Sequence, residues 1–448
     1  MKKIPCVLTI AGSDSGGGAG IQADLKTFAS LQVHGVSAIT SVTAQNTCTV
    51  SSIYDLPVEV VRAQINALLE DMPINAVKTG MLHTSDLIEV VVNELKQDFP
   101  IVVDPVMVAK SGAVLMEKNA IKTLVEKLIP IAAVITPNIP EAEKISKIKI
   151  LDVEDAKKAA RKISKIGVEA VVIKGGHLKG DLAIDVLFHS GSYYLFEASR
   201  INKDTTHGTG CTFAAAIAAE LAKGEKIHEA VHNAKKFLSD SISYGYKIGR
   251  GVGLVNPMAR VHREAEKYFI IRSLKEAIEE LERNRDIVKL VPEVQMNLVM
   301  AISNAQSIQD MAGIEGRIVK LKDKVKATGC PEFGASSHVA NTVLIAMKYD
   351  PSMRSGMNVK YSDKIIRISD KIGFSHSFYD RANEPINIKK REGKTTSWGA
   401  AQAIEKIGNV PDMIWHLGEW GKEPMISILG RSPLEVVNKA IEIAKAFE

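Results

Sequence analysis

The repeated alternation of short apolar runs with amphipathic segments in the first half of the chain constrains its fold more than any other feature. The runs are rich in Val and Ile, which is typical of buried strands, and the segments between them have apolar residues at helical spacing. This rhythm predicts a doubly wound, mainly parallel α/β sheet. The expected strands are 6–10, 36–40, 75–80, 101–107, 132–138 and 170–176, and the expected helices include 21–31, 86–97 and 154–166.

The rhythm breaks at residues 183–198, where a central Ser-Gly-Ser predicts a hairpin at the edge of the sheet. After Gly245 the chain becomes rich in glycine and basic residues, which we interpret as the end of one domain and the start of a linker. A length of 448 residues suits two domains. We therefore expect a first domain over 1–255, a linker over 256–271 and a second, smaller α/β domain over 272–448.

The second domain carries helical and strand patterns of its own. A charged helix is expected over 271–284, at the start of the domain. The other expected helices are 336–349, 363–373, 396–408 and 432–448, and the expected strands are 412–417 and 423–429. These patterns predict a mixed α/β domain.

Composition excludes several classes of protein. The net charge of +5 is small for this length and does not indicate a nucleic-acid partner. No stretch approaches the ~20 apolar residues of a membrane span, and the first apolar run is too short for a signal peptide. The four cysteines form no C-x-x-C pair, so we expect reduced thiols in the cytoplasm rather than a zinc site or disulfides. They are Cys6, Cys48, Cys211 and Cys330.

Three glycine-bearing features lie at predicted strand ends, where ligands bind in open α/β sheets. They are a glycine-rich loop around Gly12 to Gly20, the segment after Lys174, and a Gly208-Thr209-Gly210 turn that opens an alanine-rich helix. Successive backbone N–H groups at such a helix start can bind one anion, and the helix dipole adds to them. One such turn is weak evidence, but three in one domain predict a phosphate site.

Carboxylates at other predicted strand ends suggest a magnesium environment. Asp104 stands at the end of the apolar run that begins at Ile101, and Asn138 and Glu141 stand at the start of a helix. Mg²⁺ prefers a few oxygen ligands together with water and substrate phosphate. The alternatives are structural, since Asp104 also suits a turn before a proline and Glu141 suits the first turn of a helix.

The motifs at 9–28, 43–47, 78–81, 104–112, 136–141, 172–177 and 206–219 occur in the order seen in hydroxymethylpyrimidine/phosphomethylpyrimidine kinases. The first half resembles this family, which has the ribokinase-like fold and uses ATP and Mg²⁺. The resemblance implies that Lys174 and the 208–211 amides face the ATP phosphates, and that Asp104, Asn138 and Glu141 belong to the Mg²⁺ environment. It implies a pyrimidine site lined by Gly12, Asp24, Gln45, Met81, Val108 and Cys211.

Cys211 stands where many ribokinase-like kinases have a carboxylate base. A helix N-terminus beside an anion site can lower the pKa of a thiol well below ~8.5, so we expect a thiolate or a polarised thiol to serve as the base. The alternative is that Cys211 is a small buried apolar residue. Pyridoxal kinases are close relatives, but Gln45 favours the pyrimidine because its amide can pair with an aminopyrimidine edge.

The second half contains candidate phosphate-binding residues. Ser336 and Ser337 precede a helix and could hold a phosphate or simply cap it, whereas Arg354, His376 and Arg381 lie in polar loops. The stretches 313–319, 335–362, 373–381 and 416–424 resemble the thiamine-phosphate synthase domain that is fused to such kinases. This resemblance implies that Arg354 and His376 support the condensation of hydroxymethylpyrimidine pyrophosphate with thiazole phosphate.

One alternative for the second half is a sensor, because similar domains are ligand-sensing parts of transcription regulators. The expected partners are small molecules only, namely ATP, hydroxymethylpyrimidine with its phosphates, and thiazole phosphate. We expect neither nucleic acid nor membrane as a partner, and we expect a homodimer or higher homo-oligomer.

Overall fold

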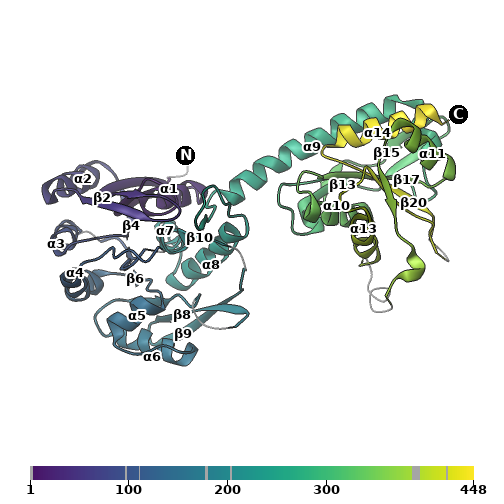
Figure 1. The fold of residues 1–448 in the computed structure, drawn as a ribbon. Coiled ribbons are helices and arrows are strands. Elements are labelled where there is room, and N and C mark those ends of the chain that lie inside the picture. Colours follow the sequence, from purple (N-terminus) through teal and green to yellow (C-terminus); the bar gives the residue numbers. More distant parts are fainter. Residues whose placement is uncertain are drawn as a thin grey trace. The chain divides into compact units, whose positions relative to one another are not determined.

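The computed structural model describes residues 4–95, 98–109, 111–176, 180–201, 204–385, 394–419 and 422–447. The chain divides into two compact units, which meet in the sequence between Val261 and His262. Each unit has its own sheet, with helices on both faces (Figure 1). Within the described residues, no helix combines the length and the apolar character that a membrane span requires.

Unit 1 is built on a nine-stranded sheet that is parallel at its centre and antiparallel at both edges. This confirms the predicted ribokinase-like α/β sheet. The predicted hairpin is β8–β9 at one edge, and a β3 strand at the other edge was not expected. The strands lie in the order β3 (Val50–Asp55), β2 (His34–Gln45), β1 (Cys6–Asp14), β4 (Ile74–Thr79), β5 (Ile101–Val103), β6 (Val134–Ile135), β7 (Ala170–Ile173), β8 (Leu182–His189) and β9 (Ser192–Ser199).

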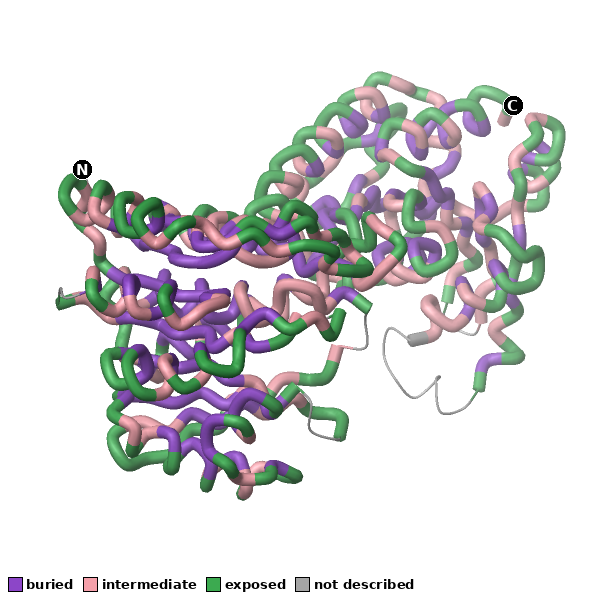
Figure 2. Tube along the Cα trace, turned by 60° about the vertical axis from the view of Figure 1, so that its left-hand side comes forward, coloured by how far each residue is buried: buried purple, intermediate pink, exposed green. Residues whose placement is uncertain are grey.

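Two apolar layers hold the helices of unit 1 against the sheet. Figure 2 shows that many of the buried positions lie along the strands. One face is covered by α1 (Gly20–Ser30), α7 (Thr209–Ala222) and α8 (Ile227–Ser243). The other face is covered by α2 (Val58–Asp71), α3 (Ser85–Glu94), α4 (Lys118–Thr123), α5 (Ile139–Ser146) and α6 (Val153–Ser164). The alanines at positions 214, 215, 216, 218 and 219 of α7 are fully buried, and their small side chains allow the helix to lie close to the sheet.

Helix α9 (Ala259–Arg283) occupies most of the segment that we expected to be a linker. The prediction of a charged helix from residue 271 was correct in type, but the helix begins twelve residues earlier. Arg260 pairs with Asp240 at 2.7 Å within unit 1, and Arg263 pairs with Asp310 at 2.5 Å within unit 2. Arg260 and Arg263, two of the basic residues that suggested a linker, are therefore partners of carboxylates along a helix.

Unit 2 contains a seven-stranded, mostly antiparallel sheet of which only two strands were expected. The order is β16 (Pro331–Phe333), β13 (Met311–Ile314), β12 (Leu298–Ala301), β17 (Ser355–Lys360), β20 (Met425–Gly430), β19 (Met413–His416) and β18 (His376–Phe378). Helices α10 (His338–Tyr349) and α13 (Lys394–Ile407) pack on one face, and α9, α11 (Asp363–Ile372) and α14 (Pro433–Ala446) pack on the other. The four expected helices are present.

Candidate functional site

A row of polar side chains crosses the face of the unit 1 sheet that carries α1 and α7. On each of five neighbouring strands, or just after it, an apolar residue that faces α1 and α7 is followed two positions later by a polar residue. These residues are Thr9 after Val7, Lys78 after Ala76, Asp104 after Val102, Thr136 after Val134 and Lys174 after Val172. Because side chains two apart on a strand share a face, the row lies beside the start of α7.

Lys78 and Asp24 form a fully buried ion pair at one end of this row. The Lys78 ammonium lies 2.8 Å from the Asp24 carboxylate, and neither side chain is exposed. Thr9, the neighbour of Lys78 on β1, donates to the same Asp24 oxygen at 2.6 Å. The other oxygen of Asp24 is buried and has no hydrogen-bond partner among the described residues. The predicted substrate-binding carboxylate is thus engaged by a lysine that sequence reasoning did not single out.

Asp104 and Lys174 form the second ion pair of the row. Their side chains meet at 2.9 Å, and Thr136 donates to the same Asp104 oxygen at 3.3 Å. A Cβ added to Gly210 would lie 3.3 Å from the second Asp104 oxygen, so the pair faces the Gly208–Gly210 turn. The structure therefore brings Lys174, Asp104 and the glycine turn together, as the sequence motifs suggested.

Asn138 and Glu141 have a structural role in the described chain. They form a reciprocal capping box at the start of α5, in which each side chain accepts the backbone N–H of the other residue. Burial raises the pKa of Glu141 to about 7, against the lowering effect of Lys174. The described part of the chain holds no group of three or more His, Cys, Asp or Glu side chains that could bind a metal ion.

Cys211 lies in the first turn of α7, partly exposed, beside the polar row. The backbone N–H of Gly20 acts to lower the pKa of its thiol. Burial raises the pKa of the Cys211 thiol to about 11, because Lys78 lowers it less than burial raises it, and Asp24 and Asp104 raise it further. Our expectation of a lowered pKa for the Cys211 thiol is therefore contradicted, because desolvation and two nearby carboxylates outweigh the lowering effects of Lys78 and the Gly20 N–H.

The two glycine segments that the sequence marked as phosphate loops touch each other. Gly208 has a φ of +86°, and a Cβ there would lie 1.9 Å from the Gly18 carbonyl oxygen. Asp14 holds the first loop by accepting the backbone N–H groups of Gly16, Gly18 and Ala19. His207 lies 3.2 Å from Asp14 and 3.3 Å from the Gln45 amide. Asp14 and His207 are site residues that sequence reasoning missed, although both stand inside the quoted motifs.

The other residues predicted to contact the pyrimidine are Gly12, Met81, Gln45 and Val108, and they differ in burial. Gly12 is buried, and a Cβ on it would lie 3.3 Å from the Met81 sulfur, so these two residues are neighbours. Gln45 is half-buried, with its backbone bonded to the Ser15 hydroxyl. Val108 is 41% exposed and forms a β-bridge with Val114.

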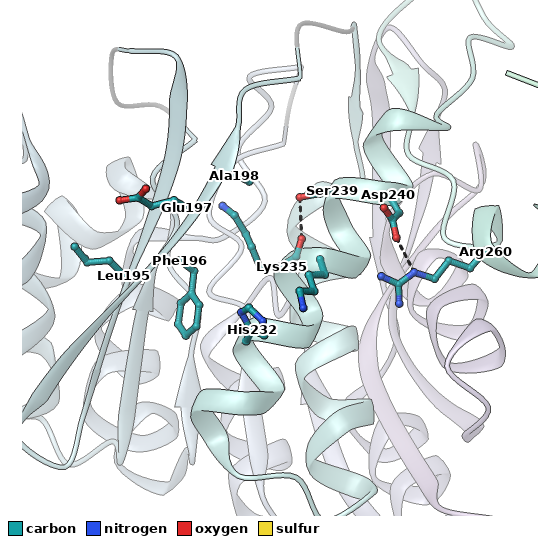
Figure 3. Close-up of a pocket in the computed structure, with 10 residues that line it drawn as sticks. Leu195, Phe196, Glu197, Ala198, His232, Lys235, Ser239, Asp240 and Arg260 are labelled. Carbon is teal, nitrogen blue, oxygen red and sulfur yellow. Dashed lines mark hydrogen bonds and ion pairs between the residues drawn. The ribbon is translucent and has the colours of Figure 1, made fainter. Parts of the chain in front are cut away.

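A separate cavity of about 400 Å³ lies between β9 and α8 (Figure 3). Phe196 and His232 line it, and Lys235 and Arg260 are held there by carboxylates at 2.7 Å. None of the residues that line it is a predicted site residue.

In unit 2, Arg354 is engaged within the protein. It lies 2.5 Å from Glu266 on α9, and it donates to the Ala301 carbonyl at 2.7 Å. Glu266 also accepts from the hydroxyl of Ser303 at 2.8 Å. The guanidinium thus closes a network between α9 and the sheet.

His376 is held at the edge strand β18. Its Nε2 lies 3.0 Å from Asp370, and its Nδ1 accepts from the Trp415 indole at 3.3 Å. The register places His376 level with Met357 of β17, with β19 and β20 between. At ~4.8 Å per strand the two backbones are about 14 Å apart. Arg354 and His376 therefore do not meet directly.

The other three candidates in unit 2 are also dispersed. Ser337 is the N-cap of α10 but makes no capping bond, and Ser336 packs against Gly313. Arg381 is 13% exposed and lies 3.9 Å from Glu419, with its Nε unbonded within the described residues. Burial, and then Arg381, lowers the pKa of the nearby His416 to about 4.

Comparison with known proteins agrees with this geometry. The family described as "Phosphomethylpyrimidine kinase" matches residues 14–256, and the family "Thiamine-phosphate synthase ThiN" matches residues 273–442. The hydroxymethylpyrimidine/phosphomethylpyrimidine kinase of Haemophilus influenzae is 48% identical over 265 residues, which are 58% of this chain and 98% of that protein. The thiamine biosynthesis bifunctional protein ThiED of Geobacter sulfurreducens is 46% identical over 252 residues, or 56% of this chain and 51% of that protein.

A solved structure confirms the fold of unit 1. An ADP complex of Bacillus subtilis pyridoxal kinase is 39% identical, with a TM-score of 0.55, and the match covers 58% of this chain and 99% of that chain. The chain spans about half of the Geobacter protein but nearly all of the Haemophilus kinase and the Bacillus structure. From its motifs, its site and these matches, the chain belongs to the phosphomethylpyrimidine kinase family and carries a thiamine-phosphate synthase ThiN domain after it.

Proposed function

We propose that unit 1 transfers the γ-phosphoryl group of ATP to hydroxymethylpyrimidine and then to its monophosphate. Unit 2 joins the resulting pyrophosphate to thiazole phosphate, giving thiamine phosphate and releasing pyrophosphate. The observation that carries the kinase assignment is the close approach of Gly18 and Gly208 next to the Asp104–Lys174 ion pair, at the first turn of the helix that carries Cys211. That junction provides backbone N–H groups for an anion directly beside a thiol.

The phosphates of ATP bind at the start of α7. The 208–211 amides and the helix dipole favour a negative group there, and Lys174 adds a positive charge. Asp104 fits a Mg²⁺ site of one carboxylate with water and phosphate oxygens, because its second oxygen faces the turn. Asp104 would hold the ion there, and the ion would supply neutralisation of the phosphate charge, whereas Asn138 and Glu141 hold the strand end in position.

Positioning does most of the catalytic work in the kinase reaction. The transferred phosphoryl group passes through a loose transition state that needs alignment and charge neutralisation more than early deprotonation. The substrate hydroxyl oxygen bonds to the γ-phosphorus, the bond to ADP breaks, and the Cys211 thiolate accepts the hydroxyl proton. Since the resting thiol is protonated, it must first lose its proton to solvent, which makes its ionisation important.

Condensation in unit 2 begins with departure of pyrophosphate from the activated CH₂ carbon, to which the thiazole nitrogen then bonds. Cationic donors fixed on the leaving oxygens stabilise this step. Because Arg354 and His376 are separated, we assign them to different parts of the bound substrates. Arg354 holds a phosphate, and His376 donates a proton or hydrogen bond.

The first test compares acceptors in the kinase reaction. We expect kcat/KM for hydroxymethylpyrimidine to exceed that for pyridoxal, because the Gln45 amide can pair with the aminopyrimidine edge. Gln45→Leu should remove most of this preference while leaving ADP affinity unchanged. Steady-state rates with each acceptor measure it, and a wild-type preference for pyridoxal would assign unit 1 to pyridoxal phosphorylation instead.

Two further predictions concern the whole protein. A homodimer or higher homo-oligomer is expected, and light scattering on the purified protein measures its mass.

The cytoplasm is the expected compartment, where the cysteines would stay reduced.

A further inference from the structure

Lys78 has a position that packing alone does not explain. It stands in the middle of the sheet, on β4 between β1 and β5, with its side chain fully buried. Replacing a buried ion pair by apolar side chains of similar volume is often neutral or stabilising, so such a pair is weak evidence for a purely structural role. The residues that surround the pair therefore indicate its function.

Cys211 is one of those residues. Helix α7 packs on β4, which carries Lys78, and on α1, which carries Asp24. In its first turn, Gly210 lies against Asp104 and Lys174. Burial alone would lower the pKa of Lys78, but Asp24, Cys211 and Asp104 together raise it above its usual range. Lys78 therefore stays an ammonium ion. Its one hydrogen bond in the described structure goes to Asp24, which leaves other N–H groups of the ammonium unused.

The space around the ammonium is shaped for it. A Cβ on Gly80 would lie 2.7 Å from the Lys78 Nζ and 2.8 Å from the Ala11 Cβ, so only glycine leaves this room. Thr9 donates to the Asp24 oxygen that already accepts from Lys78, which fixes the carboxylate on the lysine side.

Resting on the proposed kinase function, we propose that Lys78 is a positioning residue that holds a fixed positive charge beneath Cys211 and shares it between the Asp24 carboxylate and the Cys211 sulfur. Asp24 competes with the thiolate for this charge. The charge assists Cys211 when the thiol loses its proton and when the thiolate approaches the substrate hydroxyl. The other groups that act on the sulfur are the Gly20 N–H, Asp104 and Lys174.

The proposal predicts opposite effects of two isosteric changes. In Asp24→Asn, Lys78 loses its main counterion, and the Cys211 thiolate takes that place, so the thiol pKa should fall. In the double variant Lys78→Met with Asp24→Asn, both charges are removed. Because Lys78 acts on Cys211 more strongly than Asp24 does, the thiol pKa should then rise above that of the wild type. A purely structural pair would not give shifts of opposite sign.

The experiment measures the rate of Cys211 alkylation by iodoacetamide against pH, without nucleotide and with a chelator present, by peptide mass spectrometry. At pH 8 we expect alkylation about tenfold faster in Asp24→Asn and about tenfold slower in the double variant, which corresponds to one pKa unit each way. The exposed Cys48 in the same sample is the internal reference. Shifts of the same sign, or no shift in either variant, would overturn the proposal.

The test of Lys78 does not depend on the folding of one variant or on the proposed kinase function. If Asp24→Asn does not fold, the uncharged double variant decides alone, and an unchanged alkylation rate in it overturns the proposal. The alkylation needs no phosphoryl transfer, so it remains valid if unit 1 proves to prefer another acceptor. Conversely, a chain that phosphorylates hydroxymethylpyrimidine but shows no opposite shifts retains its proposed function and loses only the role of Lys78.

Discussion

Replacing Cys211 with alanine is expected to lower the kinase kcat by about 10²-fold or more, the usual contribution of a positioned acid–base group. ADP affinity should change little, because the 208–211 backbone amides that bind phosphate remain. Single-turnover phosphorylation of hydroxymethylpyrimidine and calorimetric titration with ADP measure the two effects.

A matched control shows whether the loss of any thiol lowers turnover, or only the loss of Cys211. Cys48→Ala removes an exposed cysteine outside the polar row and should leave turnover unchanged. If Cys211→Ala retains near-normal turnover, Cys211 is a packing residue, as its high pKa of about 11 would also allow, and the substrate hydroxyl loses its proton without it.

The second large effect is expected in unit 2. Arg354→Ala and His376→Ala should each lower the rate of thiamine phosphate formation by ~10²–10³, the cost of losing one donor to developing charge. Kinase activity should stay intact, because the two units have separate cores. The assay supplies hydroxymethylpyrimidine pyrophosphate and thiazole phosphate directly and measures thiamine phosphate.

Glu266 provides the control for Arg354, because the two side chains are paired at 2.5 Å. Glu266→Gln breaks the ion pair and leaves the guanidinium in place for a phosphate. If Arg354 binds substrate, Glu266→Gln should retain or increase the condensation rate; if Arg354 only ties α9 to the sheet, Glu266→Gln should impair it as Arg354→Ala does. Full activity in both Arg354→Ala and His376→Ala would show that the site lies elsewhere in unit 2.

Much of unit 1 follows from its sequence, because parallel strands buried on both faces are continuous apolar runs. The edge strand β3 was missed, since it is short and half-polar. In unit 2 the antiparallel strands are short. The apolar patterns of β12 and β17 differ too little from those of the flanking residues for the strands to be recognised. The helices there were predictable because their apolar faces repeat over three or four turns.

In the site of unit 1, too, features that depend on neighbours in the sequence could be predicted, and features that depend on residues far apart in the sequence could not. Lys174, Asp104 and the glycine turn could be predicted because each stands at a strand or helix end. Lys78 was missed although it carried a signal, namely a charge two residues after Ala76 on the same face of a strand. The ionisation of Cys211 could not be predicted, because it depends on how close Asp24 and Asp104 come in space.

The positions of Arg354 and His376 show why the second site is harder to predict. The resemblance implied that both residues support the condensation, but it did not give their distance. The sheet order β17-β20-β19-β18 puts two strands between them. That order depends on β19 and β20, which follow both residues in the chain, so the sequence around Arg354 and His376 could not show their separation.

The central claim is that one chain performs both the phosphorylations and the condensation. The most direct measurement incubates the purified full-length protein with ATP, Mg²⁺, hydroxymethylpyrimidine and thiazole phosphate, and follows thiamine phosphate by chromatography. We expect thiamine phosphate to form, with pyrophosphate released and two ADP produced for each product molecule. Accumulation of hydroxymethylpyrimidine pyrophosphate without thiamine phosphate, in protein that nevertheless binds thiamine phosphate, would contradict the claim and make unit 2 a sensor.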